Sequence, residues 1–193
     1  AANYQLRETV TQQFTISKGT LAPAVTMTGW TYQGPAEEPV NAPVIEGNEG
    51  GGAIAYTYAV SGTDEFGSYK DIVKGRAGTY IVKATIEGSE DGYDGATRTS
   101  EFTIAPKMAS ISWKGISLTY NGENQAPAAK VVNLIGDDEC AVKVEGAHKD
   151  AGEYVAMAAS LDNSNYVLPE GANQTFIIAK ANIDYAVSDY EDS

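Results

Sequence analysis

One short pattern occurs three times in this chain, and it constrains the fold more than any other feature. It begins with an Asn-Tyr-x-Leu element and ends with a Phe-x-Ile strand and a lysine, as in Asn165-Tyr166-x-Leu168 followed by Phe176-x-Ile178-x-Lys180. Earlier copies run from Asn3 to Lys18 and, more loosely, from Tyr93 to Lys107. Because self-similarity at a fixed spacing indicates repeated structural units, we predict an array of repeats.

Two further signatures set the phase of the repeat. Thr31-Tyr32-Gln33-Gly34 recurs 88 positions later as Thr119-Tyr120-Asn121-Gly122. Ala77-Gly78-Thr79-Tyr80 recurs only 74 positions later as Ala151-Gly152-Glu153-Tyr154. The first full unit therefore carries surplus residues, which we expect to project between about residues 45 and 76.

Period-two alternation predicts strands along most of the chain. Apolar residues alternate with others from Tyr80 to Ile86 and from Cys140 to Val144, and no segment shows the 3.6-residue period of a helix. Glycine-rich turn clusters separate these runs at spacings typical of antiparallel sandwiches. We therefore expect an all-β fold, with Ile54 to Val60 and Ala141 to Glu145 as central strands.

Charge and cysteine content exclude several classes of protein. The net charge of −13, from 26 acidic and 13 basic residues, repels phosphate backbones and anionic lipid. We therefore expect no nucleic acid partner. The apolar runs are too short to span a bilayer, so we expect no membrane insertion. The single Cys140 excludes an internal disulfide, and its place in an alternating run predicts a buried, unreactive thiol.

The sequence offers no catalytic constellation. We expect His148, the single histidine, to lie in a solvated turn, and we predict no enzyme activity, cofactor or metal. The acid-rich turns at Asp91–Asp94 and Gly136–Glu139 could offer oxygens to calcium, although they lack the spacing of a calcium loop. An isopeptide bond would need a buried lysine and acid beside an amide, for which Asn165 or Asn173 could serve.

A carbohydrate-binding platform is the alternative function. Trp30, Tyr56 and Tyr58 could together offer aromatic rings to a sugar, and the segment with both tyrosines is unique to the first unit. Trp113 lies in a comparable early strand of the second unit, where packing between sheets explains an aromatic residue without a ligand. We nevertheless keep a carbohydrate-binding β-sandwich using Trp30, Tyr56 and Tyr58 as the alternative function.

Asp150-Ala151-Gly152-Glu153-Tyr154 resembles the tyrosine corner of immunoglobulin-type sandwiches, in which the tyrosine hydroxyl bonds to nearby backbone. Arg76-Ala77-Gly78-Thr79-Tyr80 is a variant copy. With the Tyr-x-Gly turns and the closing strands, these elements resemble the bacterial Ig-like repeats called MBG or YDG modules over almost the whole chain. The resemblance implies tandem Ig-like antiparallel β-sandwiches in a non-catalytic stalk or adhesin segment.

The same resemblance implies a location and partners. Such modules occur in secreted or cell-surface bacterial proteins, so an extracellular location is expected, with neighbouring repeats as partners and host or matrix glycans or proteins as further candidates. The expected divisions are residues 1–17 as closing strands of a preceding repeat, 18–106 and 107–180 as two sandwiches, and 181–193 as the start of another. Phe14 and Ile16 would then lie on an orphan strand, expected to pack on the first sandwich or to pair with a neighbouring chain.

Overall fold

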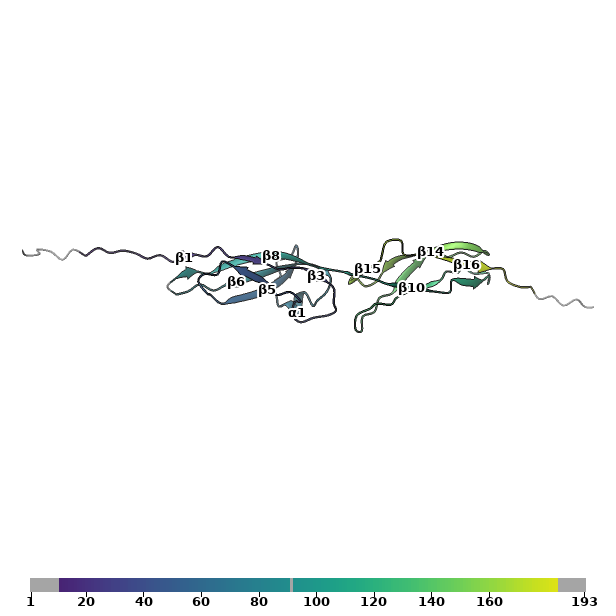
Figure 1. Ribbon diagram of the computed structural model, residues 1–193, viewed down its shortest axis with the longest axis horizontal. Helices are drawn as coiled ribbons and strands as arrows, with labels where there is room; N and C mark the ends of the chain where they lie inside the picture. The colour runs from purple at the N-terminus through teal and green to yellow at the C-terminus, as the bar shows by residue number, and fades with distance from the viewer. Residues whose placement is uncertain (1–10, 91, 184–193) are drawn as a thin grey trace, which may run out of the picture.

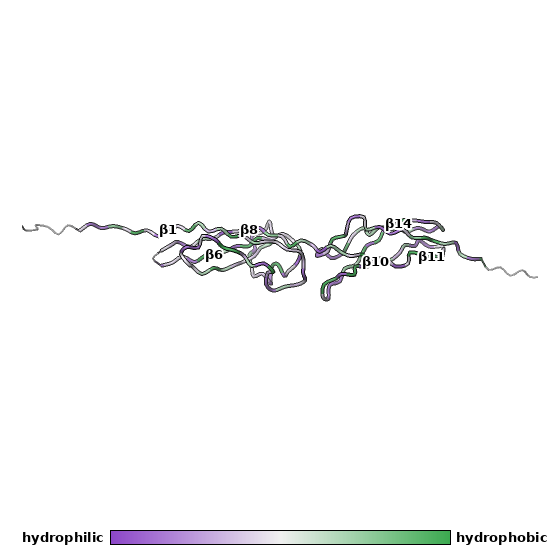
Figure 2. The backbone as a smooth tube through the Cα atoms, in the orientation of Figure 1, coloured by the Kyte–Doolittle hydropathy of each residue, from purple (hydrophilic) through white to green (hydrophobic). Residues whose placement is uncertain are grey.

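The structure is a computed structural model that describes residues 11–90 and 92–183. These residues form an all-β fold apart from one four-residue helix. Two units lie one after the other along the long axis, with β1 towards one end and β16 towards the other (Figure 1). Hydrophobic and hydrophilic residues alternate along the strands of both units rather than forming one long hydrophobic stretch (Figure 2). No described helix is long and apolar enough to cross a membrane.

The first unit comprises residues 19–105. Its main sheet has the strand order β3-β8-β6-β5, and smaller pairs are formed by β2 with β4 and by β1 with β7. The elements are β1 (Gly19–Thr20), β2 (Ala24–Thr26), β3 (Trp30–Thr31), β4 (Val44–Glu46), β5 (Ile54–Val60), α1 (Tyr69–Ile72), β6 (Gly78–Ile86), β7 (Tyr93–Asp94) and β8 (Ala96–Ala105).

The second unit comprises residues 107–179. Its main sheet has the order β11-β16-β14-β13, with smaller pairs of β10 with β12 and of β9 with β15. The elements are β9 (Lys107–Met108), β10 (Ile111–Lys114), β11 (Ser117–Thr119), β12 (Ala128–Val131), β13 (Val142–Glu145), β14 (Gly152–Leu161), β15 (Tyr166–Val167) and β16 (Asn173–Ala179).

The two main sheets share topology and register. In each, a short first strand pairs in parallel with the closing strand, so that Thr31 lies opposite Ala105 and Thr119 lies opposite Ala179. The next residue repeats one backbone bond, because the N–H of Tyr32 donates to the carbonyl of Ala105 and that of Tyr120 donates to the carbonyl of Ala179, both at 2.8 Å. Positions 32 and 120 are therefore structurally equivalent.

The alternation along β6 is confirmed. Tyr80, Val82, Ala84 and Ile86 are all buried, whereas the residues between them are half-buried or exposed. The inner face of this sheet packs against a second layer that includes Val25 of β2. The fold is therefore sandwich-like, because one face of β6 is buried between the main sheet and the second layer.

Three expectations from the sequence are wrong. The strands β5 and β13 are edge strands rather than central ones, because β6 and β14 pair with the closing strands instead. Cys140 precedes β13 and does not lie within it. The surplus residues of the first unit include α1, capped by Ser68, and two residues of this segment, Tyr69 and Val73, pack into the core rather than projecting.

The N-terminal segment does not dock on the first unit over its described part. Residues 11–18 form no strand, and the side chains of Phe14 and Ile16 are 83% and 81% exposed. Of the two expected alternatives, packing on the first sandwich is therefore wrong for these two residues, and pairing with a neighbouring chain stays a prediction. The remaining expectations for residues 1–10 and 184–193 lie outside the described residues.

Candidate functional site

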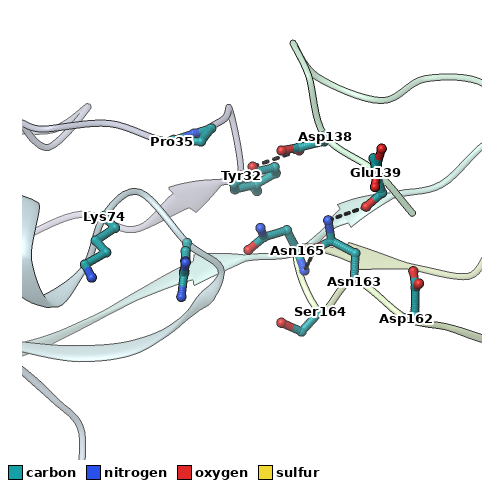
Figure 3. Close-up of a pocket in the computed structure, with 10 residues that line it drawn as sticks. Tyr32, Pro35, Lys74, Asp138, Glu139, Asp162, Asn163, Ser164 and Asn165 are labelled. Carbon is teal, nitrogen blue, oxygen red and sulfur yellow. Dashed lines mark hydrogen bonds between the residues drawn. The ribbon is translucent and has the colours of Figure 1, made fainter. Parts of the chain in front are cut away.

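The junction between the two units brings together the most connected group of polar side chains. The hydroxyl of Tyr32, from the first unit, donates to Asp138 Oδ2 at 2.8 Å, and the hydroxyl of Tyr166 donates to the same oxygen at 2.7 Å. The two rings meet edge to face, with centroids 5.7 Å apart. Figure 3 shows Tyr32 and Asp138 facing each other, joined by the dashed line of their hydrogen bond. The Asp138 carboxylate thus accepts one hydrogen bond from a tyrosine hydroxyl of each unit.

A tight turn fixes Asp138. Gly136 has a φ of 54°, which favours glycine, and the N–H of Asp138 donates to the carbonyl of Ile135 at 3.0 Å. The N–H of Ile135 in turn donates to the hydroxyl oxygen of Tyr166 at 2.8 Å. The Tyr166 hydroxyl therefore both donates and accepts within this turn, so the turn and the tyrosine hold each other in place.

A second contact crosses the junction through Asn165. Its Oδ1 accepts a hydrogen bond of 2.9 Å from the backbone N–H of Ala77 in the first unit. The loop that carries Asn165 is itself fixed, because Asn163 Oδ1 accepts from the N–H of Asn165 and Asn163 Nδ2 donates to the carbonyl of Glu139. These bonds tie the loop before β15 to the loop that carries Asp138.

The first unit positions Ala77 through its tyrosine corner. The hydroxyl of Tyr80 donates to the carbonyl of Arg76 at 3.1 Å, so the predicted corner is confirmed at this copy. The ring lies over Gly78, where an added Cβ would come within 3.1 Å of the hydroxyl. In the second unit the Tyr154 hydroxyl lies over Gly152 in the same way. Among the described residues, however, it makes no hydrogen bond, so the predicted bond is absent there.

Burial changes the acidity of both junction phenols. Desolvation and then the hydrogen bond to Asp138 raise the pKa of Tyr32 well above its usual value, and the same two causes, in the same order, raise the pKa of Tyr166. Both hydroxyls therefore stay protonated, and can donate, throughout the neutral range. Such an arrangement binds and orients one unit on another.

An open polar cleft borders these contacts. It has a volume of about 650 Å³ and is lined by Lys74 and Arg76 from the first unit and by acidic residues from the second. Figure 3 shows Asp138, Glu139 and Asp162 on the side opposite Lys74. Because opposite charges face each other across the cleft, electrostatics favours the observed orientation of the units.

The three proposed platform aromatics lie on the core side of their sheet. Tyr58 is 5% exposed and meets Phe102 and Tyr69 edge to face. Trp30 stacks on Phe102 with centroids 5.7 Å apart, and half-buried Tyr56 packs against the same core. Tyr58 is therefore buried and Trp30 and Tyr56 are half-buried against the core, so the three rings do not form one exposed flat surface of the kind that sugar stacking needs.

The remaining candidates are dispersed. His148 is exposed, and its imidazole stacks on the ring of Tyr154 with centroids 3.9 Å apart. Cys140 is only half-buried, contrary to the expected full burial, and desolvation raises the pKa of its thiol. Trp113 packs on the core of the second unit.

The calcium and isopeptide candidates do not assemble. Within residues 11–90 and 92–183, no group of three or more His, Cys, Asp or Glu side chains could hold a metal ion. Asp91, in one acid-rich turn, lies outside the described residues. Asn173 is exposed and Asn165 faces Ala77, while no charged side chain is buried in the described part of the chain. The isopeptide geometry is therefore not present there.

Sequence reasoning missed the junction as a site. It noted Asp138 in an acid-rich turn and Tyr32 and Tyr166 as repeat markers, but it predicted no contact among the three. The signal was that both tyrosines recur at matched places, which a contact between units would require. Comparisons with protein-family models, with curated proteins and with solved structures find no match for this chain.

Proposed function

We propose that this chain is a non-catalytic spacer, a stalk or adhesin segment in which Ig-like sandwich repeats are held end to end. The observation that carries the proposal is the junction, where Asp138 receives the hydroxyls of Tyr32 and Tyr166 and Asn165 receives the N–H of Ala77. A flexible linker would need none of these directional contacts. A spacer gains from them because they transmit a fixed orientation along the chain.

The position of the contacts further supports a spacer. Main-chain pairing continues up to the junction, because β9 begins at Lys107 directly after β8 ends at Ala105. Only one residue outside a strand thus connects the two units. Such a short connection limits bending, and the side-chain contacts limit rotation about the long axis.

The resemblance to MBG or YDG repeats supports the extracellular part of the proposal. It favours a secreted or surface-attached bacterial protein with neighbouring repeats as partners. The high acidic charge suits a solvated spacer, because it disfavours association with membranes and nucleic acid.

Orientation of the two units in solution tests the proposal. We expect residual dipolar couplings measured on the full chain to fit one alignment tensor for both units. Small-angle scattering should give a single elongated shape in agreement with Figure 1. Separate tensors for the two units, with scattering that needs an ensemble of bent shapes, would contradict a rigid spacer.

A further inference from the structure

The far end of the second unit reproduces the surface that the first unit offers at the junction. Tyr120 makes the same backbone bond as Tyr32, and Ala151 precedes the start of β14 as Ala77 precedes the start of β6. A shallow hollow of about 370 Å³ lies between them, lined by Tyr120, Asp150, Ala151, Lys180, Ala181 and Ile183. We call this surface the end socket.

Equivalent positions differ sharply in exposure. Tyr32 is 2% exposed because the second unit covers it, whereas Tyr120 is 38% exposed. Ala109, in the segment that leaves the first unit, is 3% exposed. Ile183 follows β16 at the corresponding distance and is 83% exposed. An exposed tyrosine and isoleucine at positions that are otherwise buried indicate an uncovered contact surface.

The backbone donor is repeated as well. At the junction the N–H of Ala77 is accepted by Asn165. At the end socket, no described residue accepts a hydrogen bond from the N–H of Ala151. The N–H of Ala151, which lines the same hollow as Tyr120, can thus donate to an amide oxygen from outside the unit.

The junction surface of the first unit and the end socket differ in charge. At the junction Arg76 and Lys74 face the acidic loop residues of the second unit. At the end socket Asp150 occupies the place of Arg76, immediately before the repeated alanine. Lys180 also lines the hollow, so repulsion of an acidic partner is confined to Asp150, and the matching partner carries a neutral or basic residue opposite that side chain.

We propose that the end socket binds a further β-sandwich unit of the same kind, joined after Ile183, whose leading loop carries an asparagine followed by a tyrosine. This inference rests on the proposed spacer function and names its partner. The asparagine oxygen accepts from the N–H of Ala151, and the tyrosine ring packs against Tyr120. A second copy of this chain fits less well, because Gly92-Tyr93 stands at its free end where Asn165-Tyr166 stands at the junction.

The test uses an extended chain. Residues 1–183 are followed by a second copy of residues 110–183, and Asp150→Arg supplies the charge found at the junction. Amide hydrogen exchange is then followed by NMR at Ala151 and at Ala77. We expect exchange at Ala151 to become slower by roughly tenfold or more relative to the unextended Asp150→Arg chain, because a closed contact protects the amide.

Controls separate the possible failures. Tyr120→Ala in the extended chain should restore fast exchange at Ala151 without affecting Ala77. Unchanged fast exchange at Ala151, with Ala77 still protected, would overturn the end socket and leave the spacer proposal standing. Fast exchange at Ala77 as well would contradict the rigid junction itself. Self-association of the unextended chain through Tyr120, seen by sedimentation, would assign the socket to a second copy and overturn the assignment to a joined unit.

Discussion

Removing one hydroxyl should loosen the junction without disturbing either unit. Tyr32→Phe keeps the ring that meets Tyr166 edge to face and deletes only the 2.8 Å hydrogen bond to Asp138. Hydrogen bonds to charged groups contribute about 1.5–3 kcal/mol. Asp138 is half-buried and keeps its bond from Tyr166, so water can partly replace the lost donor. We therefore expect the low end of this range, about 1.5 kcal/mol.

The assay is amide exchange at Ala77, whose N–H is protected only by Asn165 across the junction. In the regime where exchange follows the opening equilibrium, 1.5 kcal/mol corresponds to roughly tenfold faster exchange. Amides in the centre of β6 and β14 should be unaffected, because each unit keeps its own core.

The chain supplies a matched control. Tyr120→Phe removes a hydroxyl at the equivalent position, where the side chain is 38% exposed and makes no hydrogen bond to a described residue. Exchange at Ala77 should then equal that of the parent chain. If Tyr32→Phe also leaves Ala77 unchanged, the phenol and carboxylate contact does not hold the units together and the reasoning fails.

Four further outcomes follow from the same contacts. The folded state raises the pKa of Tyr32 and of Tyr166. The contribution of these two side chains to stability should therefore be complete below about pH 10 and be lost as the pH rises above that value. A tyrosinate absorbance titration that compares Tyr32→Phe with the parent chain can check this. Tyr80→Phe should lower the free energy of unfolding by about 1 kcal/mol, and Tyr154→Phe by less, since only Tyr80 bonds to backbone; denaturant titration compares the two. Asn165→Ala should speed exchange at Ala77 by more than Tyr32→Phe does, because it removes the acceptor of that N–H itself. Cys140 should react with a thiol reagent more slowly in the native chain than in denaturant, because desolvation raises its thiol pKa; equal rates would contradict this.

The sequence predicted the strand content and much of the inner face. Alternation from Tyr80 to Ile86 identifies which side chains point inward, because successive strand residues point to opposite faces. The same period says nothing about neighbours. Ile54 to Val60 reads as a central strand, yet β5 pairs only with β6 and lies at the sheet edge. Strand order depends on long-range pairing that a local pattern does not contain.

The short helix and the platform show two other limits. The helix α1 has four residues, too few to display a helical period, so the inward positions of Tyr69 within it and of Val73 directly after it were not predicted. Tyr58 was considered for sugar stacking because aromatic residues suit both cores and binding surfaces. Its contact with Phe102, 44 positions away, decides for the core.

The junction shows why one repeated motif can have two outcomes. Tyr32 and Tyr120 occupy equivalent backbone positions, so their local sequences give both the same conformation. Burial differs because it depends on what lies beyond the unit. The rings of Tyr32 and Tyr166 meet edge to face, while Asp138 accepts from two fixed directions and so selects one rotation of the units. Each hydrogen bond of this kind adds only about 1.5 kcal/mol of stability, but it also fixes a direction, and a fixed orientation is what the proposed spacer requires.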